Sequence, residues 1–160
     1  MDAERLARAQ ELFQEAYQLQ VEGEFDTAVS LYKQSLETYP TAEAHTFLGW
    51  TYRNQGKLEE AIAECKRAIE VDPRFGNPYN DIGVYLMELG KPDQALEWLE
   101  KAIASERYQS RHYPWYNLGR IYAGKDYYAK ARECFRQALE LAPGYVPAAQ
   151  ALDRLRRLIQ

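Results

Sequence analysis

Long hydrophobic runs are missing from this 160-residue sequence, and cysteine is scarce. A membrane-spanning helix needs about 18 consecutive apolar residues, and no such run occurs, so we expect no membrane insertion. Residues 1–6 are charged and lack the apolar core of a signal peptide, which predicts a cytoplasmic protein. Cys65 and Cys134 are too few and too far apart for a disulfide framework or a metal site. We expect both to pack between helices.

Basic residues are outnumbered by acidic ones, 20 to 24, which gives a formal net charge of −4. Phosphate binding depends on clustered lysine and arginine, so nucleic acid is disfavoured as the main partner. Catalytic motifs are lacking as well: His112 has no serine or cysteine nucleophile in a recognisable motif, and His45 occupies a helix-packing position. We therefore expect neither an enzyme nor a cofactor.

What the sequence does contain is a repeated helical stripe. In residues 115–122, large and small residues recur at spacings of three, four and seven, which places them on one helical face. These residues are Trp115, Leu118, Gly119 and Tyr122. Residues 45–52 and 79–86 carry Gly49 and Gly83 in the same frame. Glycine at this point predicts close approach of a neighbouring helix.

The stripe repeats with a period of 34, the interval from Gly49 to Gly83 and again from Ala61 to Ala95. Two helices therefore fill each period. The pattern resembles the tetratricopeptide repeat, whose signature is W-x2-L-G-x2-Y followed by alanine, an aromatic residue and proline. This resemblance implies an all-α, right-handed superhelical solenoid of helix-turn-helix units with a C-terminal capping helix, acting as a protein–protein interaction adaptor.

We expect a single domain over residues 1–160, with repeats at 9–41, 42–75, 76–111 and 112–145 and a capping helix at 146–160. Two residues are inserted before the fourth repeat, so residues 107–113 form a longer loop. Its arginines, histidine and tyrosines predict either a contact with an acidic residue of a partner or a solvated connection. In the fourth repeat, Asp126 stands where the other repeats have a glycine between their helices.

The resemblance also implies that a second stripe on each first helix lines a concave groove. Its rings would bury side chains of a protein or peptide ligand, and its amides would satisfy the backbone of that ligand. The alternative is that neighbouring helices partly bury the rings. The candidate binding residues are Phe13, Tyr17, Phe47, Trp50, Asn80, Asp81, Tyr116, Asn117 and Arg120.

One ligand mode of the family can be tested on the sequence. Members that bind chaperone tails clamp a C-terminal carboxylate with lysine, asparagine and arginine at fixed groove positions. Here those positions carry Phe13, Tyr17, Phe47, Asn77 and Asp81, and the next frame along matches no better. We therefore expect no chaperone-tail clamp. Two other functions stay open: a nucleic-acid-binding helical repeat, and a regulatory fragment of a larger enzyme.

Overall fold

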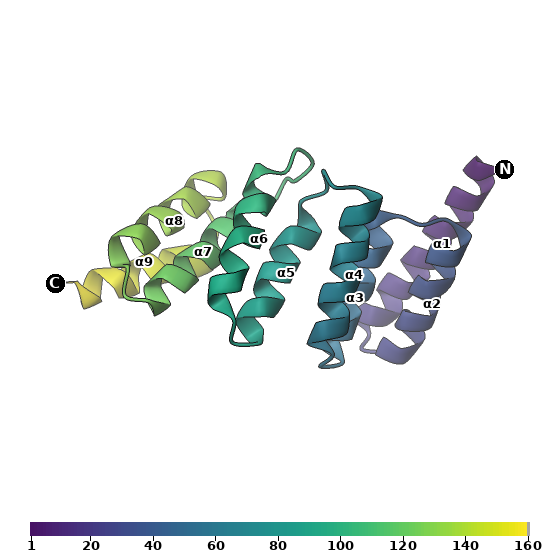
Figure 1. The fold of residues 1–160 in the computed structure, drawn as a ribbon, viewed down its shortest axis with the longest axis horizontal. Coiled ribbons are helices and arrows are strands. Elements are labelled where there is room, and N and C mark those ends of the chain that lie inside the picture. The colour runs from purple at the N-terminus through teal and green to yellow at the C-terminus, as the bar shows by residue number, and fades with distance from the viewer. Residues whose placement is uncertain (160) are drawn as a thin grey trace.

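The computed structural model describes residues 1–159, which fold into helices joined by short turns (Figure 1). The helical hairpins stand side by side in one row, with the two termini at opposite ends (Figure 1). The predicted all-α solenoid is confirmed. The helices are α1 (Asp2–Val21), α2 (Phe25–Thr38), α3 (Ala42–Asn54), α4 (Leu58–Val71), α5 (Asn77–Glu88), α6 (Pro92–Ala104), α7 (His112–Gly124), α8 (Tyr128–Leu141) and α9 (Val146–Leu158).

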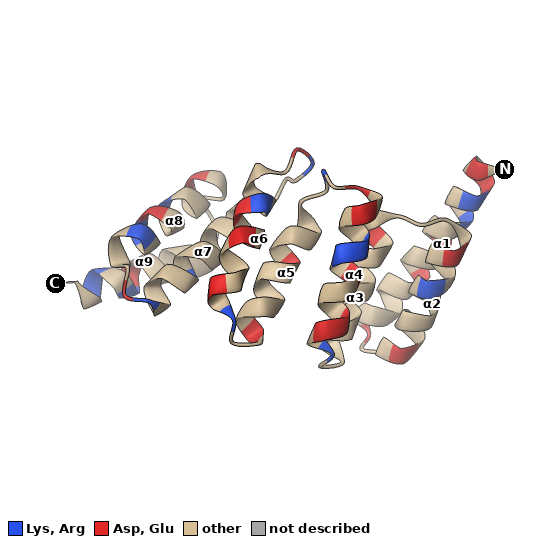
Figure 2. Ribbon diagram, in the orientation of Figure 1, with Lys and Arg blue, Asp and Glu red and all other residues tan. Residues whose placement is uncertain are grey.

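The packing order separates the helices into two layers. Each first helix packs on its own second helix and on the second helix of the preceding hairpin. The first helices also touch in sequence, α1 with α3, α3 with α5, and α5 with α7. They therefore line one common wall. Figure 2 shows acidic and basic residues banded along α4, α6 and α8, whereas α5 and α7 carry few.

Glycine in the repeated stripe allows the two helices of a hairpin to approach. A Cβ atom added at Gly83 would lie 2.5 Å from Cδ2 of Leu99, a position that no real Cβ atom adopts. At Gly49 the added atom would lie 3.0 Å from the carbonyl oxygen of Ala61. The predicted close approach at these glycines is confirmed.

The turn inside each hairpin needs one residue with a positive φ. Gly23, Gly56 and Gly90 supply it with φ values of 86°, 79° and 76°. In the fourth hairpin Asp126 adopts φ 63°, and its Oδ1 accepts a hydrogen bond from the hydroxyl of Tyr128 at 2.9 Å. The left-handed region disfavours side chains, but aspartate tolerates it better than most residues because it can hydrogen-bond locally.

Small residues fill the space between layers. Both cysteines are buried there, as predicted, and burial raises the pKa of Cys134 to about 11 and that of Cys65 well above its ordinary value. At the C-terminal end, α9 buries Ala148, Ala151 and Leu155. Leu158, near the end of the helix, is 64% exposed.

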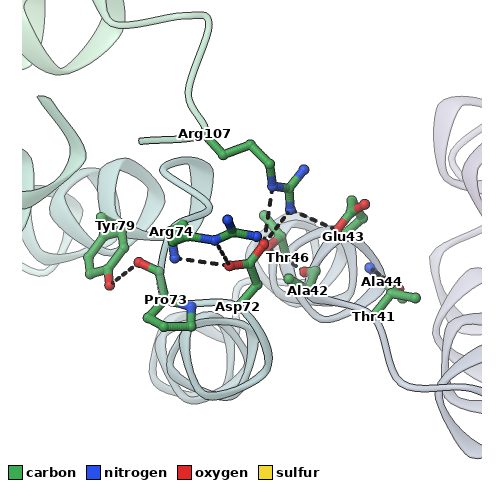
Figure 3. Close-up of polar contacts among 10 residues, drawn as sticks. All are labelled: Thr41, Ala42, Glu43, Ala44, Thr46, Asp72, Pro73, Arg74, Tyr79 and Arg107. Atoms are coloured by element: carbon green, nitrogen blue, oxygen red, sulfur yellow. Dashed lines mark hydrogen bonds and ion pairs between the residues drawn. The ribbon is translucent and has the colours of Figure 1, made fainter. Parts of the chain in front are cut away.

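The connection from α6 to α7 is packed against the preceding hairpin. The backbone N–H of Arg107 donates to the carbonyl of Arg74 at 3.0 Å, and its guanidinium pairs with Asp72 at 3.0 Å and with Glu43 at 3.3 Å (Figure 3). The same guanidinium lies 4.3 Å from the ring centroid of Phe75.

The second arginine of this connection is also engaged within the chain. Arg111 donates to the carbonyl oxygens of Ile103, Ser105 and Tyr108, which closes the connection over the end of α6. The side chain of Tyr108 is only 5% exposed. The connection is therefore held to the chain by both arginines and by Tyr108, although Glu106, Arg107 and Gln109 remain exposed to solvent.

Candidate functional site

A hollow of about 540 Å³ opens on the wall made by the first helices. Residues from α1, α3, α5 and α7 line it, so it spans all four hairpins. We call it the central hollow. Its lining residues are Tyr17, Thr46, Phe47, Trp50, Arg53, Asn77, Asp81, Val84, Tyr85 and Tyr113.

One side of the central hollow is a row of aromatic rings. The Phe47 ring lies edge-on to Phe13 at 5.2 Å and to Tyr17 at 5.7 Å, and its centroid is 5.8 Å from that of Trp50. Edge-to-face contacts of this kind fix ring orientation. Tyr17 and Trp50 are each 38% exposed, whereas Phe13 and Phe47 pack against the core around Tyr32. The inner pair thus supports the outer pair.

The two predicted asparagines lie deeper than the rings. Asn80 is 7% exposed and Asn117 is 6% exposed. Asn117 Nδ2 donates to Asn80 Oδ1 at 3.1 Å, and Arg120 donates to Asn117 Oδ1 at 3.3 Å. The structure therefore places these amides in the contact between α5 and α7, and neither lines the central hollow.

Asp81 is the half-buried acid of the central hollow. Burial raises its pKa to about 7, and the neighbouring Asn80 side chain partly opposes that rise. Arg53, the other charged lining residue, is held by Glu88 with nitrogen–oxygen distances of 2.6 and 3.2 Å. Within residues 1–159, no basic side chain forms an ion pair with Asp81.

The remaining predicted residues lie at a second hollow of about 300 Å³ between α7, α8 and α9. Tyr116 and Arg120 line it together with Phe135 and Arg154. The Arg120 guanidinium lies 5.8 Å from the Tyr116 ring centroid. The nine predicted residues thus separate into the ring row with Asp81, the buried amide pair, and this C-terminal site.

Sequence reasoning missed Tyr145, which lies in the connection between α8 and α9. Its ring is 4.9 Å from that of His112, 5.6 Å from that of Tyr113 and 5.4 Å from that of Tyr116. It therefore joins the central hollow to the C-terminal site. No signal in the repeat pattern marks this position, because it follows Pro143 and Gly144 outside the helices.

Comparison with known proteins agrees with this repeated geometry. Sequence profiles described as "Tetratricopeptide repeat" match residues 42–75, 79–107 and 112–145, together more than half of the chain. The chain belongs to the tetratricopeptide repeat family. The resemblance seen in the sequence is therefore confirmed, and the two profiles that span a full repeat each cover one helical hairpin of the TPR solenoid.

Among curated TPR relatives, "Small glutamine-rich tetratricopeptide repeat-containing protein 2" of Saccharomyces cerevisiae is 26% identical over 113 residues, covering 66% of this chain and 31% of that protein. The chain spans about a third of the length of the curated relatives it matches. No helix of the described TPR chain is both long and apolar enough to cross a bilayer.

Solved TPR structures share the fold. Pseudomonas aeruginosa pilF superposes with a TM-score of 0.87 at 24% identity, covering 94% of this chain and 68% of that one. The first TPR domain of Spaghetti (RPAP3), solved with an HSP90 peptide, superposes with a TM-score of 0.68 at 21% identity, covering 74% of this chain and 93% of that one.

Proposed function

We propose that this TPR chain is a non-enzymatic interaction scaffold that binds an extended segment of a partner protein in its central hollow. The observation that carries the proposal is the exposed pair Tyr17 and Trp50, held by the inner rings Phe13 and Phe47 at the edge of a hollow of about 540 Å³. Small-ligand and side-chain sites commonly have volumes of about 300–1,000 Å³. Tyrosine and tryptophan are the residues that most often dominate interface energetics.

The position of the hollow supports an elongated ligand. Its lining comes from four successive first helices, so a bound segment would lie across the hairpins and contact several repeats at once. Val84 of α5 and Tyr113 of α7 also line the hollow, so apolar contacts for such a segment come from the C-terminal half of the chain as well. The HSP90 peptide in the RPAP3 structure supports the choice of a peptide, since that chain has the same fold.

The competing functions find less support in the contacts. Nucleic-acid binding needs free cations, but Arg53 is engaged by Glu88 and the net charge is −4. His45 does not line the central hollow; its Nδ1 lies 2.8 Å from Glu64 Oε2, and Glu64 also pairs with Arg67, so the histidine joins α3 to α4 in the contact between them.

A selection from a library of random displayed peptides tests the proposal. The wild-type chain is compared with a variant carrying Phe47→Ala, Trp50→Ala and Tyr116→Ala. A control carries Tyr127→Ala, Val71→Ala and Leu141→Ala, which removes three exposed apolar side chains that lie outside both hollows. We expect the groove variant to lose the selected peptides and the control to keep them. Equal retention by all three proteins would reject the groove.

A further inference from the structure

We propose that the segment bound in the central hollow carries a lysine or arginine whose side chain pairs with Asp81, next to an apolar side chain that contacts Trp50. This inference rests on the proposed function and specifies the chemistry of its ligand. The ligand is a segment of a protein, and its basic group is a side chain within an extended backbone.

Charge complementarity is the first step of the argument. Of the residues that line the central hollow, only Arg53 and Asp81 carry formal charges. Glu88 pairs with Arg53 through the Nε–Nη2 edge of the guanidinium, so the charge of Arg53 already has a counter-ion. Asp81 has no such partner among the described residues, which leaves one negative charge without a counter-ion facing the hollow.

Burial is the second step. Besides Asn80, the groups that interact with Asp81 include Cys65 from α4, Tyr85 from α5 and Tyr108 from the α6–α7 connection, and burial raises the pKa of all three, which favours their neutral forms. A carboxylate in such surroundings loses hydration without gaining an opposite charge, and this favours its protonated form. A ligand cation would restore the missing interaction, whereas a ligand carboxylate would add repulsion.

The rings that line the central hollow also favour a cation. Tyr17, Trp50 and Tyr113 line the same hollow, and the faces of such rings attract ammonium and guanidinium groups. A guanidinium can in addition form two parallel hydrogen bonds with one carboxylate while its plane stacks on a ring. The hollow therefore combines a carboxylate with aromatic faces, which is the pair of groups that a basic side chain needs.

The group that titrates in this site is Asp81, with its pKa of about 7. Charged and titratable neighbours come from every packed element: Arg53 from α3, Cys65 from α4, Tyr85 and Glu88 from α5, Tyr108 from the connection, and Tyr113 and His112 from α7. Burial lowers the pKa of His112, which favours its neutral form.

The test is the same random-peptide selection, carried out in parallel on wild-type protein, on Asp81→Asn and on Glu97→Gln as an exposed control on α6. We expect lysine or arginine at a fixed position in the peptides held by wild type and by Glu97→Gln, and no such enrichment with Asp81→Asn. Titration then compares the best selected peptide with its glutamine analogue. The analogue should bind wild type at least about tenfold more weakly, and Asp81→Asn should bind both alike.

A pH series adds a second readout. Because deprotonated Asp81 is the form that pairs with a cation, affinity of wild type for the basic peptide should rise about tenfold from pH 6 to pH 8. The Asp81→Asn variant should show no such rise. Wild type and Asp81→Asn should bind the glutamine analogue with equal affinity, and that result would show that the groove of the variant is folded.

The two proposals fail in different ways. If wild type holds no peptide that the groove variant loses, the groove function itself is rejected, and this inference is rejected with it. If peptides are selected that require Trp50 but show no basic preference, or bind Asp81→Asn equally well, the groove stands and the pairing with Asp81 is overturned.

Discussion

Asn117 donates a hydrogen bond from Nδ2 to Oδ1 of Asn80 across 3.1 Å, although the two residues are 37 positions apart in the chain. The bond joins α5 to α7 at a point where both side chains are almost fully buried. It therefore connects neighbouring hairpins along the wall of first helices, where apolar contacts supply the rest of the packing.

The amide pair predicts strong coupling between two repeats. Asn117→Ala should destabilise the fold by about 1–3 kcal/mol, because it leaves the buried Asn80 oxygen without its donor. The double variant Asn80→Ala with Asn117→Ala should cost clearly less than the sum of the single changes. Urea denaturation of the four proteins measures this cycle. A double variant whose cost equals the sum would show that the bond contributes nothing.

This pair also shows where sequence reasoning stops. The resemblance to the family implied which stripe of each first helix lines the groove, and from that stripe Tyr17, Trp50 and Asp81 lie at the central hollow. Depth within that face depends on how closely α5 approaches α7, and the period carries no information about that distance. Asn80 and Asn117 were consequently expected at the surface of the groove but are buried in a helix contact.

The connections between helices are the second feature that the sequence did not predict. The two residues added before α7 suggested an open loop, yet Arg107 and Arg111 tie this connection to carboxylates and backbone carbonyls of earlier segments. Asp72 is 35 positions from Arg107 and is brought near it only by the superhelix, whereas Arg111 binds carbonyl oxygens no more than eight positions away. Tyr145 was missed for the same reason, since its ring neighbours belong to α7.

Substitution by alanine should change stability in opposite directions at two glycines with different surroundings. Gly83→Ala should destabilise by about 1–3 kcal/mol, because its Cβ would overlap Leu99 in a packed contact. Gly124→Ala, near the end of α7, meets no atom within 4 Å and should instead stabilise by about 0.5–1 kcal/mol through helix propensity. Thermal unfolding of both variants checks the pair. A neutral Gly83→Ala would mean that Leu99 moves aside freely.

Asp126 offers a stabilising change. Its φ of 63° is a conformation that glycine adopts without strain, so Asp126→Gly should raise the free energy of unfolding by about 0.5–1 kcal/mol. The lost acceptor of the Tyr128 hydroxyl is exposed and offsets little of this gain. Asp126→Ala should destabilise, because alanine has neither the freedom of glycine nor a local hydrogen bond. Denaturant titration at pH 7 separates the two signs.

Asp72 makes stability depend on pH. Its pKa is lowered, first by the backbone N–H of Arg74 and then by the guanidinium of Arg107. A lowered native pKa means that the carboxylate stabilises the fold above its unfolded pKa, near 4, and that this contribution is lost as the pH falls through the native value.

Arg107→Ala should therefore cost about 0.5–1 kcal/mol at pH 6, the range of a partly exposed ion pair. The difference from wild type should shrink as the pH falls from 5 to 2, while contact with Phe75 keeps it above zero. Arg157→Ala, which breaks an exposed pair with Asp153 on α9, serves as the control and should cost almost nothing at either pH. A difference independent of pH would mean that Arg107 acts through packing alone.

Two leucines one turn apart on α9 should differ sharply in how much stability is lost when each is replaced by alanine. Leu155 is 3% exposed and packs with Phe135 and Ala151, so Leu155→Ala should destabilise by about 2–5 kcal/mol through lost burial and a cavity. Leu158 is 64% exposed, and Leu158→Ala should change stability by no more than about 0.5 kcal/mol. Both substitutions keep helix propensity, so the difference isolates the contact with α8. Urea denaturation, with amide hydrogen exchange of α8 as a local readout, measures it. If the two variants were equally stable, α9 would not act as the cap that shields the last hairpin from water.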